Sequence, residues 1–183
     1  MTTTLGIRDD DAASALRLAI AGDEVAFTRI VATHHTAMTR VAYVVSGDLG
    51  VADDAVASAW AIAWRRMHTV RDPDRLGSWL VSVAANEARQ LVRRQRRRSV
   101  REIPLDATDG PVVGDPSARA PDLDLARVLA TLHADDRALL ALRYVAGLNS
   151  TELGRATGRS ASGTRARLAR LLDRLRTELG DGD

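Results

Sequence analysis

Apolar residues recur at helical spacing through the first part of the chain. From Asp23 onward, most intervals between apolar positions are three or four residues, which places them on one side of a helix. The positions on that side are Phe27, Ile30, Val31, His34, Met38, Val41 and Val45. Gly47 and Gly50 then bracket a predicted turn. The pattern predicts one long helix before this turn.

Two further helices are predicted before the middle of the chain. The second has Asp53 and Asp54 in its first turn, where the helix dipole favours negative charge. It runs through Val56, Trp60, Ala63, Trp64 and Met67. The third runs from about Ser78 into a series of arginines. Its inward positions are Leu80, Val83, Ala84, Leu91 and Val92.

The last third of the chain has the pattern of a helix-turn-helix. Two apolar stripes come first, at Leu125, Val128, Leu129 and Leu132, and at Leu139, Leu142 and Val145. Asn149 and Glu152 have the spacing of a capping box at the start of a short helix. Thr157 and Gly158 turn the chain, and Ser160 can cap a final helix. A short helix, a tight turn and a longer Arg-rich helix are typical of a helix-turn-helix.

Prolines separate the two helical units. Four of the five prolines lie within eighteen residues, at Pro104, Pro111, Pro116 and Pro121. Such a stretch cannot sustain a helix or a central strand, and no other stretch alternates like a β-strand. We therefore predict an all-α chain of two small helical domains, residues 11–98 and 121–179, joined by a flexible acidic linker at 99–120.

The charges are segregated along the chain although the net charge is only +2. All 26 basic residues are Arg, and seven of them lie between Arg89 and Arg101 with no acid among them. Seven more lie between Arg155 and Arg176, with only Asp173 against them. The planar guanidinium group binds phosphate in a bidentate manner. A GC-rich genome accounts for the preference for Arg over Lys, but the two clusters favour a nucleic-acid partner.

One face of the third predicted helix combines side chains that suit nucleic acid. Trp79, Ser82, Asn86, Arg89 and Arg93 share a face opposite the Leu/Val stripe. Arg binds phosphate, Asn can hydrogen-bond a base edge, and an indole can stack on an unpaired base. The alternative is a core position for Trp79 and a solvated helix end for the arginines. We favour nucleic acid for Asn86 and the arginines and leave Trp79 open.

The final helix is the second candidate. Arg165, Arg167 and Arg170 follow Ser160 within three turns. A recognition helix presents its N-terminal residues to base edges while nearby arginines hold phosphates. The alternative is an amphipathic surface helix with Arg–acid pairs, and the scarcity of acids in this segment favours DNA.

Trp60 and Trp64 are four residues apart on the second predicted helix, which ends in Arg65 and Arg66. Tryptophans at this spacing often lie in the core. Two of them beside arginines would also form a docking patch for a partner protein. The sequence leaves both interpretations open.

Other chemistries lack the residues they need. The chain has no Cys, which excludes a disulfide, a thiol nucleophile and a zinc-thiolate site. His34 and His35 are adjacent and point about 100° apart on a helix, so they cannot clasp one metal ion. Asp53 and Asp54 fail as a catalytic pair for the same reason. No phosphate-binding loop or nucleophile elbow is present, and we expect no enzymatic activity, no metal and no cofactor.

The chain also gives no sign of a targeting or membrane segment. Its start, MTTTLGIRDDD, is acidic and has no apolar core, which a signal peptide requires. The apolar run at 55–64 is far shorter than the roughly 20 residues of a spanning helix. We expect a cytoplasmic protein with no membrane contact of its own.

The order of these features resembles a known family, the bacterial sigma factors of the extracytoplasmic-function (ECF) type within the sigma-70 family. The family's opening is similar to LRLAIAGDEVAFTRIVATHH, and its region 2.2 helix is similar to GVADDAVASAWAIAWRR. Regions 2.3 and 2.4 are similar to SWLVSVAANEARQLVRRQRRR. Region 4 resembles LATLHADDRALLALRYVAGLNSTELGRATGRSASGTRARLARLLDRLR. The resemblance covers most of the chain, and it implies a dissociable subunit of RNA polymerase that directs promoter recognition.

The resemblance also assigns residues to partners. The helix that docks on the polymerase β′ clamp corresponds to Asp53, Asp54, Trp60, Trp64 and Arg65. The −10 element would be contacted by Asn86, Arg89, Arg93, Arg94 and Arg97, with a flipped base near residues 68–77. The −35 element would be contacted by Ser160, Ser162, Arg165, Arg167 and Arg170. The family further implies the β flap, promoter DNA and an anti-sigma protein as partners.

Two points remain open at this stage. Gly163 stands where the family usually has Thr, and Thr164 where it has an apolar residue, which affects the register of the recognition helix. The alternative function is a stand-alone helix-turn-helix regulator. Such a protein would bind DNA with the second unit in the same way, but it would not need the docking helix or the Asn86 face. A DNA-processing enzyme would need a catalytic constellation that the sequence lacks.

Overall fold

The computed structural model describes residues 9–101 and 127–180, and every regular element in these ranges is helical. The α-helices include α1 (Asp9–Ile20), α2 (Glu24–Ser46), α3 (Leu49–Arg66), α4 (Leu76–Arg101), α6 (Ala134–Leu140), α7 (Ser150–Thr157) and α8 (Ala161–Gly180). Shorter turns are η1 (Met67–Thr69) and η2 (Pro73–Arg75), and η3 (Ala141–Val145) is a π-helical turn. The predicted all-α fold is confirmed.

The ends of α2 and α3 are set by capping residues. Asp23 accepts a hydrogen bond from the Ala26 amide, and Gly47 ends α2 at φ +76°, a left-handed conformation that glycine adopts without strain. Asp48 then caps α3 by accepting from the Val51 amide at 2.8 Å. The second helix therefore begins earlier than the sequence pattern predicted. Asp53 and its neighbour lie in the second turn rather than the first.

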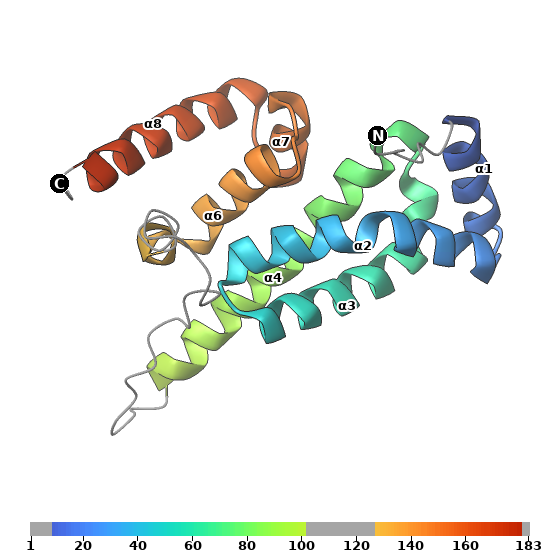
Figure 1. Ribbon diagram of the computed structural model, residues 1–183, viewed down its shortest axis with the longest axis horizontal. Coiled ribbons are helices and arrows are strands. Elements are labelled where there is room, and N and C mark those ends of the chain that lie inside the picture. Colours follow the sequence, from blue (N-terminus) through green and yellow to red (C-terminus); the bar gives the residue numbers. More distant parts are fainter. Residues whose placement is uncertain (1–8, 102–126, 181–183) are drawn as a thin grey trace, which may run out of the picture.

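The first three long helices pack around small side chains. Helix α3 turns a line of fully buried alanines, at Ala52, Ala55, Ala59 and Ala63, toward α2 and α4. Side chains of this size let helix backbones approach closely. Met38 of α2 and Leu80 of α4 fill the remaining space and are fully buried. Helix α1 crosses the N-terminal end of α2 (Figure 1).

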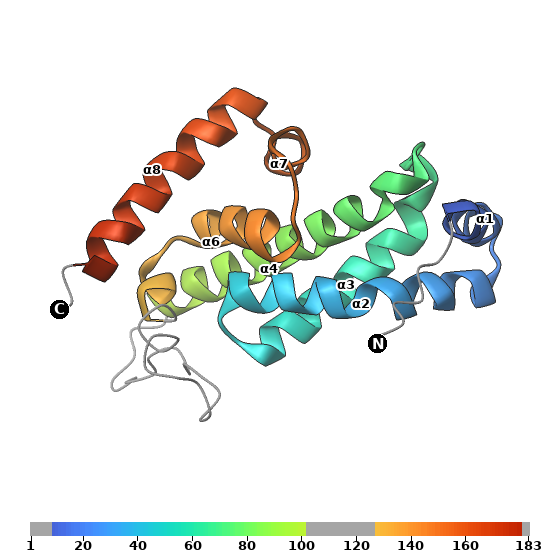
Figure 2. The same ribbon diagram turned by 45° about the horizontal axis from the view of Figure 1, so that its top comes forward.

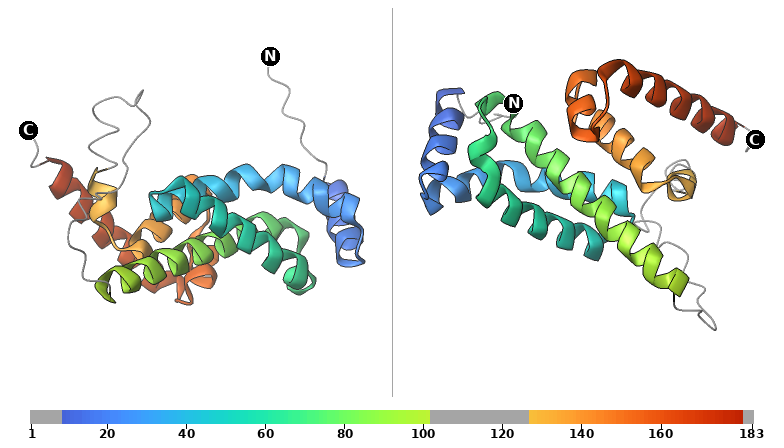
Figure 3. Two further views of the ribbon diagram at one scale, coloured as in Figure 1. Left: turned by 90° about the horizontal axis from the view of Figure 1, so that it is seen from below. Right: turned by 180° about the vertical axis from the view of Figure 1, so that it is seen from behind.

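Helix α6 and η3 pack directly on α2 and α4. Ala138, Leu139, Ala141 and Leu142 belong to the same apolar cluster as the core of the first three long helices. Figure 2 shows α6 lying along α2 and α4, and Figure 3 shows the same arrangement from below and from behind. The two helical units thus share one apolar core in this structure. The predicted linker at 99–120 begins inside α4, which continues to Arg101, and its remainder lies outside the described residues.

The helix-turn-helix consists of α7 and α8. The predicted capping box is present, because the Asn149 side chain accepts from the amides of Thr151 and Glu152 while the Glu152 carboxylate accepts from the Asn149 amide. Gly158 ends α7 at φ +67°. A smaller apolar cluster holds α8 in place, with Leu132, Leu140, Leu171 and Leu175 buried in it.

The start of α8 is well defined despite Gly163. Ser160 precedes α8, and its hydroxyl accepts a hydrogen bond from the Gly163 amide at 3.1 Å, as the predicted cap requires. Thr164 is only 1% exposed, and its hydroxyl donates to the Ser160 carbonyl at 2.9 Å. A satisfied hydroxyl lets Thr164 occupy a core position. The register is therefore the one that places Thr164 inward.

One buried cation ties the two units together. Arg137 of α6 is 6% exposed, and its Nε donates to the Val45 carbonyl in the last turn of α2 at 2.7 Å. Its Nη1 donates to the Leu132 carbonyl at 3.1 Å. Burial, and then the nearby charge of Arg96, lower the pKa of Arg137 from its usual value. The guanidinium is thus held by carbonyl oxygens on both sides of the contact.

We predict that Arg137→Ala lowers the free energy of unfolding by about 2–3 kcal/mol, because it leaves buried carbonyls without donors and removes packed methylenes. Urea denaturation of the full chain measures the change. Arg176→Ala is the control, since that side chain is 74% exposed and pairs only within α8, and it should shift stability by less than about 0.5 kcal/mol. Equal changes in the free energy of unfolding for the two substitutions would contradict the role of Arg137 in joining the two units.

Two glycines of the helix-turn-helix should respond oppositely to alanine. A Cβ at Gly154 would lie 2.7 Å from the Arg159 carbonyl oxygen, so Gly154→Ala should destabilise the chain by about 1–3 kcal/mol. A Cβ at Gly163 would meet only the Ser160 hydroxyl at 3.1 Å, and the gain in helix propensity is about 1 kcal/mol. Gly163→Ala should therefore be neutral or stabilising. Thermal unfolding of both variants tests the pair, and a stable Gly154→Ala protein would refute the close approach.

Candidate nucleic-acid interface

The outer face of α3 presents both acids and aromatics. Asp53 and Asp54 are exposed near its start, and Arg65 is exposed at its end. Trp64 is 42% exposed, with its ring edge-on to Phe27 at 4.8 Å between centroids. An indole with this much solvent-exposed surface offers apolar area to a partner protein.

Trp60 lies deeper than Trp64. Its ring meets Phe27 edge-on at 5.7 Å, and its Nε1 donates to His35 Nδ1 at 3.2 Å. One tryptophan of the pair therefore has a core position, and the other is available for docking. Trp60 packs against the core and supports the surface, while Trp64 forms part of the surface itself.

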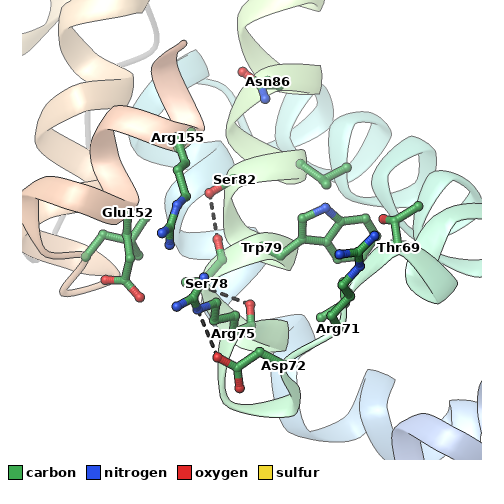
Figure 4. Close-up of a pocket in the computed structure, with 14 residues that line it drawn as sticks. Thr69, Arg71, Asp72, Arg75, Ser78, Trp79, Ser82, Asn86, Glu152 and Arg155 are labelled. Carbon is green, nitrogen blue, oxygen red and sulfur yellow. Dashed lines mark hydrogen bonds and ion pairs between the residues drawn. The ribbon is translucent and has the colours of Figure 1, made fainter. Parts of the chain in front are cut away.

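The candidate face of α4 opens into a cavity of about 460 Å³. Trp79, Ser82 and Asn86 of α4 line one wall, as their spacing predicted. The segment Thr69–Arg75 lines a second wall, where Arg75 pairs with Asp72 at 2.9 Å. Figure 4 shows these groups together with Glu152 and Arg155, which enter from α7. The cavity therefore joins the predicted base-binding residues of the first unit to a helix of the second.

The arginines that follow Asn86 divide into two groups. Arg89 donates from Nη1 to Asn86 Oδ1 at 3.0 Å, and its Nε lies 2.8 Å from Asp135 Oδ1. Arg93 donates from Nη2 to both oxygens of Asp135, at 2.8 and 2.6 Å. Arg94 and Arg97 are exposed on α4. The structure thus places the first two predicted phosphate ligands against α6 and the other two on the surface.

The arginines of α8 divide in the same way. Arg165 and Arg170 are exposed, as is Ser162. Arg167 instead donates from Nε and Nη2 to Asp136 Oδ1, at 2.9 and 2.7 Å. Arg174 Nη2 lies 3.6 Å from the other oxygen of Asp136. Of the predicted −35 arginines, the structure brings two to the surface and holds the third against α6.

Two acids at the start of α6 were not singled out from the sequence. Asp135 and Asp136 occupy its first turn, where the helix dipole alone would explain their presence. The arginine partners of Asp135 on α4 are at least 42 residues away in the sequence, and those of Asp136 on α8 are at least 31 residues away. No local spacing signals a pairing over that distance. The one available sign was a pair of acids between two Arg clusters.

Burial opposes the ionised form of Asp135, and the charges of Arg89 and Arg93 outweigh it, so the pKa of this carboxyl lies below its usual value. The carboxylate is therefore ionised at neutral pH.

Within residues 9–101 and 127–180, no three His, Asp or Glu side chains converge to hold a metal ion. No helix in these ranges is both long and apolar enough to cross a bilayer.

Comparison with known proteins identifies the family. The family model described as Sigma-70 region 2 matches residues 30–98. The ECF RNA polymerase sigma factor SigM of Mycobacterium tuberculosis is 30% identical over 167 residues, which are 86% of this chain and 83% of that protein. RfaY of Xanthomonas campestris is 27% identical over 169 residues, 88% of this chain, and the chain spans 42% of its length.

The fold is that of solved sigma factors. The sigma factor RpoE of Bartonella quintana, solved in complex with the anti-sigma factor NepR, superimposes with a TM-score of 0.70. The match covers 86% of this chain and 98% of that one at 19% identity. A stand-alone helix-turn-helix regulator is not favoured, since the family match lies in the first unit. The chain belongs to the ECF RNA polymerase sigma factors of the sigma-70 family, which act in transcription initiation.

Proposed function

We propose that this sigma factor docks on the β′ clamp of core RNA polymerase with the outer face of α3. Trp64 and Arg65 form its centre, with Asp53 and Asp54 about three turns away along the same helix. Trp60 acts indirectly, because its packing on Phe27 fixes the neighbouring indole. Exposed aromatic and Arg side chains are the commonest anchors of protein interfaces.

The −10 element of promoter DNA is assigned to α4 and the cavity beside it. Asn86 would hydrogen-bond a base edge, and Trp79 would offer a stacking surface to an unpaired base. Arg94 and Arg97 are exposed to bind phosphate, and Arg89 and Arg93 are assigned the same role. The observation that carries the proposal is this cavity, in which indole, amide and hydroxyl groups meet beside an Arg-rich helix end.

The −35 element is assigned to the N-terminal half of α8. Ser160 and Ser162 lie at the helix start, and Arg165 and Arg170 are exposed beyond it. The amides at this end favour a phosphate. Arg167 joins this set only when it leaves Asp136. Tyr144 and Val145 of η3 are exposed and would serve the contact with the β flap.

The remaining partners follow from the family. The relative RpoE was solved with an anti-sigma factor, and we propose that an anti-sigma protein also binds this chain. We infer a cytoplasmic location, where the polymerase acts. We further infer that the chain has no catalytic activity of its own and serves as a regulatory subunit.

Docking on polymerase should depend on α3. Trp64→Ala and Arg65→Ala should each weaken binding to purified core polymerase by at least about tenfold, roughly 1.4 kcal/mol, since both remove exposed anchors. Leu179→Ala is the control, because Leu179 is a 44% exposed apolar residue near the end of α8, off the proposed docking face. Fluorescence anisotropy measures the affinity. Undiminished binding by a folded Trp64→Ala protein would refute the docking assignment.

Recognition of the −10 element should depend on Asn86. Promoter fragments selected with the parent holoenzyme would be substituted base by base, and Asn86→Ala should reduce discrimination at one −10 position by about 1–3 kcal/mol. Gln90→Ala is the matched control, because this exposed amide on the same helix pairs with Glu87. Run-off transcription gives the preference of each holoenzyme. If Asn86→Ala keeps the parent's preference at every −10 base, Asn86 does not read the promoter.

A further inference from the structure

Two consecutive carboxylates of α6 hold arginines from both proposed DNA-binding surfaces. Asp135 binds Arg89 and Arg93 of the −10 face. Asp136 binds Arg167 and Arg174 of α8. Both acids lie in the first turn of a helix that packs on α2 and α4. A single element therefore occupies cationic groups on two separate surfaces.

The contacts of Asp135 resemble those of a phosphate. Arg93 spans both of its oxygens from one nitrogen, and Arg89 approaches one of them from the side. Arg89 Nε is buried, yet its N–H is not aligned for a hydrogen bond to any acceptor. This arginine is thus held by charge without being fully satisfied. A better-placed anion could take it from Asp135.

The contacts of Asp136 are more buried. Its side chain is 12% exposed, and the guanidinium fork of Arg167 grips one oxygen with two nitrogens. Arg159, Arg170 and Arg174 line the same cavity of about 450 Å³. One carboxylate among four guanidinium groups leaves an excess of positive charge. Such a cavity is suited to phosphate oxygens.

Helix α7 of the second unit also lines the cavity beside α4. Glu152 and Arg155 of α7 line it opposite Ser78 and Ser82 (Figure 4). The Glu152 carboxylate places a negative charge on this wall, beside the positive charge of Arg155. Helix α7 therefore forms part of the wall of the proposed −10 surface, while Asp135 holds two of its arginines.

The docking surface is not covered in the same way. Trp64 and Arg65 remain exposed on α3 while α6 and α7 pack on α4. The closed arrangement thus leaves the polymerase surface accessible while it masks DNA-binding arginines.

We propose that Asp135 and Asp136 act as intramolecular substitutes for DNA phosphates, so that the free protein is a closed form that binds DNA poorly until α6 leaves α4. This inference rests on the proposed DNA surfaces and adds their regulation. Core polymerase docks on the exposed face of α3 first. Promoter phosphates then replace the two carboxylates as the arginines are released.

The test uses the full chain without polymerase. The variants are Asp135→Asn, Asp136→Asn and the double substitution, which keep side-chain shape and remove the negative charge. The control is Asp173→Asn, which removes the same charge from an exposed pair within α8. The probes are a labelled 20-nucleotide single strand and a 20-base-pair duplex of arbitrary sequence, since phosphate contacts do not depend on sequence.

We expect the double variant to bind both probes at least tenfold more tightly than the control. Its log–log salt dependence on the duplex should be steeper by about 0.9 for each arginine released to a phosphate. The Asp173→Asn variant shows how much the loss of one exposed negative charge alone changes the affinity for DNA. Equal affinity and equal slope for the variants and this control would overturn the inference.

A distance measurement reports opening independently of DNA. Because the chain has no Cys, Ala37→Cys on α2 and Thr177→Cys on α8 allow two spin labels at exposed positions. The double variant should give a longer or broader distance distribution than the parent. An unchanged distribution would overturn the closed form as an effect of these acids. If the double variant does not fold, each single variant gives the same comparison.

Failure of the proposed function would look different. Holoenzyme containing Asp135→Asn should initiate transcription at least as well as the parent, because the acid opposes DNA binding. If neither the parent holoenzyme nor the Asp135→Asn holoenzyme recognises a promoter, the proposed DNA surfaces are refuted. Normal transcription combined with unchanged DNA affinity of the free chain would refute only the phosphate substitution.

Discussion

The position of α6 is fixed by a buried guanidinium that has carbonyl oxygens for partners. Arg137 reaches the last turn of α2 and the segment before α6 at once, so the two helical units meet in one orientation. A helix C-terminus carries partial negative charge, which compensates a buried cation without an acid. The neighbouring Asp135 and Asp136 then point toward α4 and α8 because they share the same turn. Both cationic surfaces are therefore linked through three consecutive residues.

The apolar and ionic parts of this contact have different energetic roles. Ala138, Leu139 and Leu142 bury surface in the common core, and this burial supplies most of the attraction between the units. The ion pairs of Arg93 with Asp135 are about half exposed, and pairs of this kind contribute at most about 1 kcal/mol. These ion pairs matter more for the binding of other anions to the arginines than for the stability of the fold. A weak pair still excludes an anion from the same guanidinium until it is broken.

The sequence predicted the helices and their caps better than the contacts between them. Asn149 and Ser160 cap helices through neighbours within four residues, so a local pattern is sufficient. The start of α3 was misplaced because Asp48 directly follows a glycine turn and was assigned to it. Arg89 and Arg167 have the residue type and spacing of phosphate ligands. Their carboxylate partners depend on how distant helices pack, which no helical period encodes.

The chemistry of arginine explains why one set of side chains can serve both states. Arg167 directs Nε and Nη2 to a single oxygen of Asp136, a geometry that the single ammonium of lysine cannot reproduce. The same planar fork fits two oxygens of a phosphate. A carboxylate presents fewer oxygens and less charge than the backbone of DNA, which offers one phosphate about every 1.7 Å along the duplex. Closed and DNA-bound forms therefore compete for identical donors, and the outcome depends on how many phosphates are within reach.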